Sequence, residues 1–154
     1  MKKKVLPILL AVSLLLNVVV IYFLANEPTQ EERGRHMAIQ EISFAITSLE
    51  GCEARWNQFD YTEAVAHLYA VCQHVESLRK VEYSVTTQPF QELYGAAAFY
   101  PEVVRENEAE MIAALSKINT EDCLTDEEIM GEFKAFTEEM KIKAVEAELN
   151  RHRS

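Results

Sequence analysis

Glycine and proline are scarce in this chain, with four of each among 154 residues. A fold of many short strands and tight turns needs more of both, because they supply the backbone conformations of turns. Alanine, glutamate and leucine are abundant instead, and no strand-type alternation extends beyond a few positions. The composition therefore predicts an all-α protein.

Catalytic and metal-binding motifs are missing as well. The sequence has no Gly-x-Ser-x-Gly elbow, no Gly-rich phosphate loop and no cysteine within a protease signature. The acidic clusters at 102–110 and 121–128 lack the spacing of a calcium loop. His67 and His74 are seven residues apart, which is about 10 Å along a helix and too far to share an ion. We therefore expect no enzyme activity, no cofactor and no bound metal.

Charge is distributed unevenly along the chain. All 25 acidic residues follow position 26, whereas Lys2, Lys3 and Lys4 are three of the 15 basic residues. The region from Glu27 onward therefore has 12 basic and 25 acidic residues, a formal charge of −13. A domain with this charge repels phosphates, so we expect it to bind no nucleic acid.

One long apolar run occupies residues 5–25, where Ser13 and Asn17 are the only polar side chains. As a helix it spans about 31 Å, the thickness of a hydrocarbon core. The lysines before it and Glu27 after it place the N-terminus in the cytoplasm. We expect a cytoplasmic stub at 1–4, a transmembrane signal anchor at 5–25, a linker at 26–30 and an extracytoplasmic domain at 31–154.

The alternative is a cleaved signal peptide that releases a secreted domain. Such peptides have a short apolar core and small residues before the cut. Here the run is longer, and a cut after Ala25 would put Phe23 where a small residue is needed. The uncleaved single-pass anchor in the cell membrane is therefore the preferred interpretation.

Apolar spacing and capping motifs predict four helical stretches of about 20–30 residues in the domain. The first follows Thr29 and has its apolar seam at Ala38, Ile42, Ala45, Leu49, Cys52, Trp56 and Phe59. The second begins near Asp60, with Ala64 or Val65, Leu68, Cys72, Val75 and Leu78 on one face. The third begins at Pro89, breaks at Pro101 and continues with Val104, Met111, Leu115 and Ile118. The fourth begins near Thr125 and carries Ile129, Phe133, Phe136, Met140, Ala144 and Ala147.

These stretches most simply pack as an antiparallel helical bundle of about four helices. A parallel coiled-coil dimer through the first helix is the alternative, because its seam follows a heptad pattern over three repeats. The seam is rich in alanine, and the short connection near Asp60 provides a partner helix within the same chain. The bundle is preferred, and the oligomeric state stays open.

Cysteines matter in an exported domain, where disulfides persist. Cys52 and Cys72 lie on the facing seams of the first two helices, offset by about one helical turn if the chain reverses at Asp60. This offset argues against a disulfide between them and favours two small buried core residues. Cys123 lies in a polar connection, where an exposed thiol is able to form an intermolecular bond.

Aromatic residues gather around the break in the third stretch. They are Phe90, Tyr94, Phe99 and Tyr100. If the break at Pro101 opens the bundle, these residues line a ligand pocket or partner groove. Aromatic residues at such places more often fill the core, and this is the preferred interpretation.

Two functions remain open. The favoured one is a non-enzymatic interaction or scaffold module of the cell envelope with a protein partner, whose sign is a large exposed apolar patch. The alternative is a small-ligand binding or sensing domain that uses the break at 95–101. Only residues 1–4 would lie in the cytoplasm, so such a sensor has to act through a membrane partner.

Overall fold

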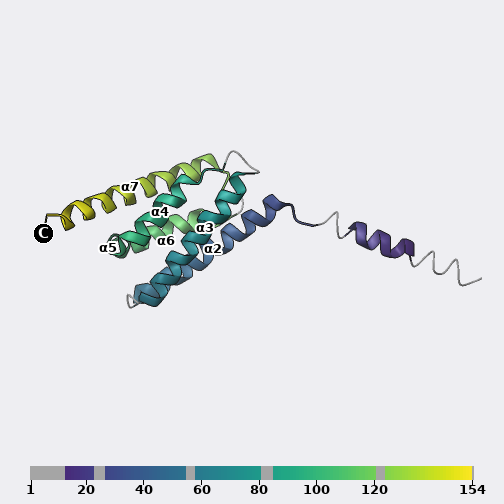
Figure 1. The fold of residues 1–154 in the computed structure, drawn as a ribbon, viewed down its shortest axis with the longest axis horizontal. Helices are drawn as coiled ribbons and strands as arrows, with labels where there is room; N and C mark the ends of the chain where they lie inside the picture. The colour runs from purple at the N-terminus through teal and green to yellow at the C-terminus, as the bar shows by residue number, and fades with distance from the viewer. Residues whose placement is uncertain (1–12, 23–26, 55–57, 81–84, 121–123, 154) are drawn as a thin grey trace, which may run out of the picture. The chain divides into compact units, whose positions relative to one another are not determined.

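The computed structural model describes residues 13–22, 27–54, 58–80, 85–120 and 124–153. Every regular element in these ranges is a helix, so the all-α prediction is confirmed for them. The chain divides into two compact units, Met1–Gln30 and Glu31–Ser154. The second unit contains the helical bundle (Figure 1).

In the first unit, residues 13–22 form a helix whose apolar side chains are exposed. Leu15, Ile21 and Tyr22 are 67%, 63% and 66% exposed. The predicted anchor at 5–25 extends from this helix in both directions into positions outside the described residues. No helix in the described part of the chain is long and apolar enough to cross a membrane.

The first two helices of the bundle are α2 (Gln30–Ala54) and α3 (Gln58–Arg79). A Cβ atom added at Gly34 would lie 2.9 Å from Leu78, and one added at Gly51 would lie 3.2 Å from the Asp60 carboxylate. Residues early in α2 thus face residues late in α3. The two helices are antiparallel, as expected for neighbours joined by a short connection.

The predicted seam of α2 is confirmed up to the end of that helix. Ala38, Ile42, Ala45, Leu49 and Cys52 are at most 1% exposed. The extension of the seam to Phe59 is wrong, because α2 ends at Ala54 and Phe59 lies in the first turn of α3, where it is 67% exposed. Trp56 lies outside the described residues.

The third predicted stretch is divided into α4 (Gln88–Phe99), α5 (Pro101–Glu106) and α6 (Glu108–Lys117). The break at Pro101 is confirmed. A second break, at Asn107, was not predicted, and there the side-chain Nδ2 donates to the carbonyl of Val103 at 2.7 Å. Local bonds of this kind compete with the helical backbone pattern. The described part of the bundle therefore has six helices, α2 to α7, in place of about four.

The last helix, α7 (Glu127–Arg151), has its N-cap one residue after Thr125, near which the fourth stretch was expected to begin. The N-cap is Asp126 and not Thr125, since the Asp126 carboxylate accepts from the backbone N–H groups of Glu128 and Ile129 at 3.0 Å. Aspartate is among the strongest N-cap residues. The helix dipole also favours its negative charge at this end.

The buried face of α7 differs from the prediction at several positions, since Ile129 and Ala147 are only partly buried and Met130 is buried instead. Phe133, Met140 and Ala144 are buried as expected, but Phe136 is only half-buried and Thr137 is fully buried. The Thr137 hydroxyl donates to the carbonyl of Lys134 at 3.0 Å. This bond lets a polar residue enter the core at low cost.

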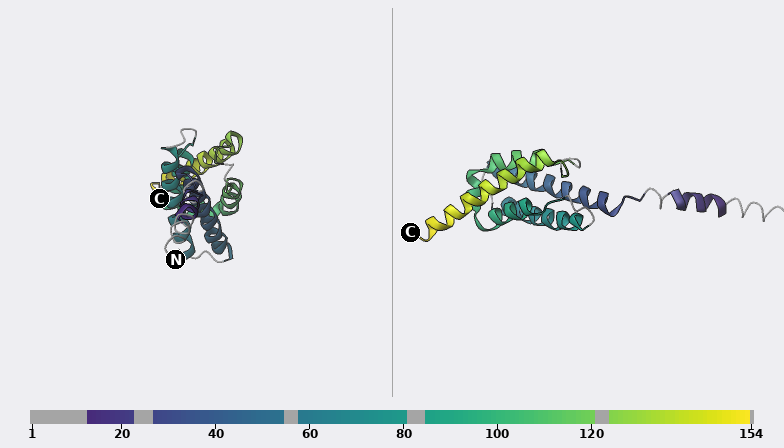
Figure 2. Two further views of the ribbon diagram at one scale, coloured as in Figure 1. Left: turned by 90° about the vertical axis from the view of Figure 1, so that its right-hand side faces the viewer. Right: turned by 90° about the horizontal axis from the view of Figure 1, so that it is seen from above.

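Helix α4 occupies the centre of the bundle, where it packs against both α3 and α7 (Figure 1). Phe90 of α4 meets Phe133 of α7 with ring centroids 5.0 Å apart, and Tyr94 meets Tyr69 of α3 at 5.4 Å. Helices α5 and α6 also pack on α7. The C-terminal end of α7 extends beyond the other helices of the bundle (Figure 2).

The close approach of α2 and α3 at Gly34 predicts opposite effects of alanine at two helical glycines. Gly34→Ala should lower the free energy of unfolding by about 1–2 kcal/mol, because the added methyl group collides with the fully buried Leu78 side chain and forces it to shift within the core. Gly131→Ala, in an exposed turn of α7 with nothing within 4 Å, should raise it by about 0.5–1 kcal/mol. Urea unfolding of both variants measures these changes.

A double-mutant cycle with Leu78→Ala provides the control. The loss from Gly34→Ala should become smaller when Leu78 is shortened, because the two residues then no longer collide. Equal stability of the Gly34→Ala and Gly131→Ala variants would contradict the close approach.

Candidate functional site

The two described cysteines lie far apart on the first hairpin. Gly51 faces Asp60 and Gly34 faces Leu78, so the position opposite Cys52 is residue 59 or 60, twelve to thirteen residues before Cys72. This separation is about 20 Å along the helix, and no disulfide joins the two residues. Burial raises the pKa of the Cys72 thiol to about 11, so it is poorly reactive at neutral pH. The predicted offset of one helical turn between Cys52 and Cys72 was therefore too small. Cys123 lies outside the described residues.

His67 takes part in packing and pairing between α2 and α3. His67 Nδ1 lies 2.6 Å from Glu41 Oε2, and its ring lies 5.2 Å from the Phe44 ring. This pair ties α3 to α2. In the described part of the chain, no three His, Cys, Asp or Glu side chains group so as to hold a metal ion.

The aromatic residues at the predicted pocket occupy different environments. Phe90 is buried against Phe133, and Tyr94 packs on Tyr69. Phe99 is 68% exposed. The guanidinium of Arg151 lies over the Tyr100 ring, 5.3 Å from its centroid.

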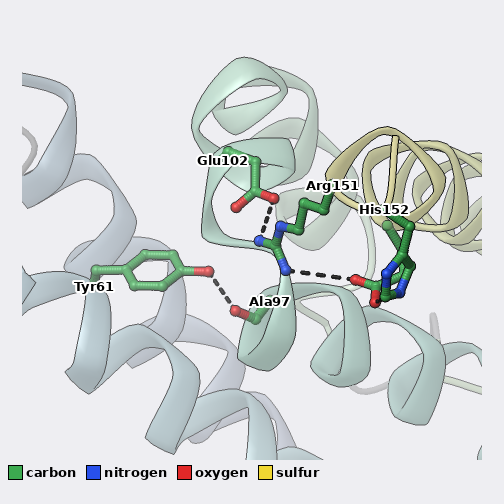
Figure 3. A network of polar contacts seen from close by, with 6 residues as sticks. Tyr61, Ala97, Glu102, Arg151 and His152 are labelled. Carbon is green, nitrogen blue, oxygen red and sulfur yellow. Dashed lines mark hydrogen bonds and ion pairs between the residues drawn. The ribbon is translucent and has the colours of Figure 1, made fainter. Parts of the chain in front are cut away.

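A hollow of about 600 Å³ does open beside the break, between α3 and α4. Other residues line it, namely Gln58, Tyr61, Thr62, Val65, Ala97, Ala98 and Pro101. The Tyr61 hydroxyl donates to the Ala97 carbonyl at 2.5 Å (Figure 3). Burial, together with the nearby Cys52 and Glu102, raises the pKa of Tyr61 well above its usual value. Tyr61 therefore stays protonated and holds α3 to α4.

A cluster of charged residues fastens the end of α7 to α5. Arg151 pairs with Glu102 of α5 and lies 3.6 Å from Glu148, which also meets His152 at 3.0 Å (Figure 3). All four side chains are at least 41% exposed. Because its members are exposed, the cluster encloses no site. Exposed pairs contribute little to stability, so its role is to orient the end of α7.

A second hollow of about 390 Å³ lies between α4 and α7, and we call it the α4–α7 groove. It is lined by Gln88, Glu92, Glu138, Lys141, Ile142, Val145 and Glu146. Ile142, Val145 and Leu149 form an apolar row on α7, which we call the α7 stripe, and they are 60%, 53% and 51% exposed. The groove thus has apolar residues on the α7 side and carboxylates around them.

Glu92 is the most enclosed charged group of the groove, with 11% of its side chain exposed. Its Oε1 atom accepts from Gln88 at 3.0 Å and from Lys141 at 2.8 Å. Its Oε2 atom is buried and accepts no hydrogen bond from any residue that the structure describes. The Gln88 bond, followed by the Lys141 bond, lowers the pKa of Glu92, so the group is ionised at neutral pH.

The α7 stripe was not predicted from the sequence. Its signal is nevertheless readable, because Ile142, Val145 and Leu149 are three and four residues apart and share one helix face. The predicted core face of α7, from Ile129 to Ala147, did not include these three residues. A helix that is apolar on two faces indicates a second contact surface.

Comparison with known proteins adds no relative. No family model, no curated protein and no solved structure matches this chain. A function for the chain therefore has to follow from its own residues.

The lowered pKa of Glu92 predicts a pH-dependent contribution to stability. A carboxyl group whose folded pKa lies below its usual value of 4.5 stabilises the fold above that pH, and the contribution is lost as pH falls through the folded pKa. Glu92→Gln should therefore cost about 1 kcal/mol of unfolding free energy near neutral pH. The difference from the unchanged chain should shrink below about pH 4.5.

Urea unfolding between neutral and acidic pH measures this difference, with Glu132→Gln as the matched control. Glu132 is also paired with a lysine, Lys117, at 2.8 Å, but is 57% exposed. Its substitution should change stability by less than about 0.5 kcal/mol. A Glu92→Gln cost that stays constant down to low pH would contradict the assignment.

Proposed function

We propose that this chain is a membrane-anchored interaction module of the cell envelope, without enzymatic activity, whose helical domain binds a protein partner through α7. The observation that carries this proposal is the exposed α7 stripe beside the α4–α7 groove. Single exposed apolar side chains are ordinary on soluble proteins. An aligned row of them beside a groove is typical of a contact surface.

The spacing of the α7 stripe supports a protein partner over a small molecule. Ile142, Val145 and Leu149 extend for seven residues, about 10 Å along the helix axis. Apolar residues at this spacing are the anchors by which helices recognise helices. The groove widens the surface to α4, since Gln88 and Glu92 also line it.

The anchor is supported by the apolar run at 5–25 and the lysines before it. The helix at 13–22 has exposed apolar side chains, including Leu14, Val18 and Ile21. A helix that is apolar on all sides is suited to a lipid environment. With the N-terminus in the cytoplasm, the positive-inside rule directs the domain to the outside.

A small-ligand binding domain is the second candidate. The hollow of about 600 Å³ at the break near Pro101 favours it, because its volume suits a small molecule. The alanines and Val65 make its lining largely apolar, and Gln58 and Thr62 add polar groups.

The anchor predicts that the chain stays in the membrane after an alkaline carbonate wash. Protease added outside intact cells should remove the domain at 31–154. Replacing Leu15 and Val19 by arginine should release the chain or prevent its insertion, because each arginine costs about 2.5–3.5 kcal/mol in a spanning helix. Leu15→Ile with Val19→Ile is the matched control. Recovery of a soluble domain that has lost residues 1–25 would support the secreted alternative.

The proposed partner contact predicts position-dependent cross-linking. A photo-reactive amino acid at Val145 or Leu149, in cells that make the chain at its native level, should give one discrete product. The same group at Glu132, on another face of α7 where its partner is Lys117 of α6, should give none. Equal labelling at all three positions, or none at any, would contradict the α7 contact, and the ligand-binding candidate would take its place.

A further inference from the structure

We infer that the α4–α7 groove binds a basic amphipathic helix of the partner protein, with an arginine or lysine of that helix reaching Glu92. This inference rests on the proposed function, because it uses the same α7 stripe. It adds the chemistry of the partner, and three features of the groove carry it.

The first feature is charge. The groove is lined by the carboxylates Glu92, Glu138 and Glu146 and by one ammonium group, Lys141, which already pairs with Glu92. Lys143, on the same helix, lies toward Asn107 and Glu139, at 2.5 and 2.8 Å. The groove therefore has an excess of negative charge next to an apolar stripe, and a complementary segment alternates apolar with basic side chains.

The second feature is the buried oxygen of Glu92. Gln88 and Lys141 both bind Oε1, so Oε2 is an acceptor that these two donors do not use. Leaving a buried charged acceptor without a donor costs free energy. A guanidinium or ammonium group that enters the groove would supply this donor once the Glu92 carboxylate rotates to bring Oε2 to the groove surface, and the two would form a charge-assisted hydrogen bond.

The third feature is that the negative charge of the groove discriminates between possible binding partners. A second copy of this chain would bring its own Glu138 and Glu146 to the stripe, and like charges across an interface are unfavourable. Anionic lipid headgroups are repelled in the same way. A basic amphipathic helix complements both the apolar surface and the negative charge of the groove. Its apolar side chains cover the α7 stripe, and its cationic side chains meet the carboxylates.

The test measures binding of two synthetic peptides to the full chain in nanodiscs of zwitterionic lipid, by fluorescence anisotropy against empty discs. Both peptides carry the same leucine and alanine face, and their polar face is arginine in one and glutamate in the other. The arginine peptide should bind at least about 10-fold more tightly. Added salt should weaken its binding.

Substitutions distinguish the contribution of the Glu92 charge to peptide binding from that of the apolar surface. Glu92→Gln should weaken binding of the arginine peptide about 10-fold, which is the effect of one charged hydrogen bond. Glu132→Gln, which removes an equal charge on another face of α7, should leave binding unchanged. Val145→Ser should weaken binding of the arginine peptide because the apolar contact is lost. If Glu92→Gln lowers the unfolding temperature markedly, the double variant Glu138→Gln, Glu146→Gln at the exposed rim replaces it.

Equal binding of the two peptides, or equal effects of Glu92→Gln and Glu132→Gln, would overturn the basic partner. Absence of peptide binding together with a cross-link at Val145 would overturn the basic partner and leave the interaction module in place. Absence of both would overturn the two proposals together.

Discussion

The packing of α4 between α3 and α7 is the constraint on which the rest of this structure depends. Small side chains make it feasible, since Ala96 and Ala97 are buried and let neighbouring helices approach closely. On the α3 side, the Tyr61 hydroxyl closes the contact on the Ala97 carbonyl. On the α7 side, Phe90 meets Phe133. Because aromatic and alanine side chains of α4 pack against its neighbours, both α3 and α7 are held with few polar groups inside.

The groove follows from the same contact. Helix α7 turns one face toward α4, where Met140 and Ala144 are buried, and this leaves the α7 stripe exposed on another face. Glu92 lies at the boundary between the two, where Lys141 and Gln88 satisfy one of its oxygens. A groove with an apolar side and an enclosed carboxylate is therefore a consequence of how α4 and α7 pack, and its chemistry gives the proposed partner its charge.

Several features of the bundle were readable from the sequence because they depend on local periodicity. The seam from Ala38 to Cys52 and the break at Pro101 are of this kind, since a heptad pattern and a proline act within one helix. Phe59 was misassigned because periodicity does not mark where one helix ends. The burial of Thr137 was not predicted, because periodicity does not show which polar residue finds a local acceptor. The cluster of aromatic residues near the break was identified from the sequence. The hollow beside the break is lined by other residues, including Tyr61 of α3 and Ala97 of α4, and it depends on how these helices pack.

The sequence by itself determined the helical class, the apolar run at 5–25, the acidic charge of the domain and most of the residues that the bundle buries. Only the tertiary structure decided that α4 takes the centre, that Cys52 and Cys72 lie far apart, and that the α7 stripe stays uncovered. The physical reason is that helix formation and amphipathicity depend on residues a few positions apart. The choice of which apolar face is buried depends on the fit between side chains distant in the chain, and a single helix does not contain that information.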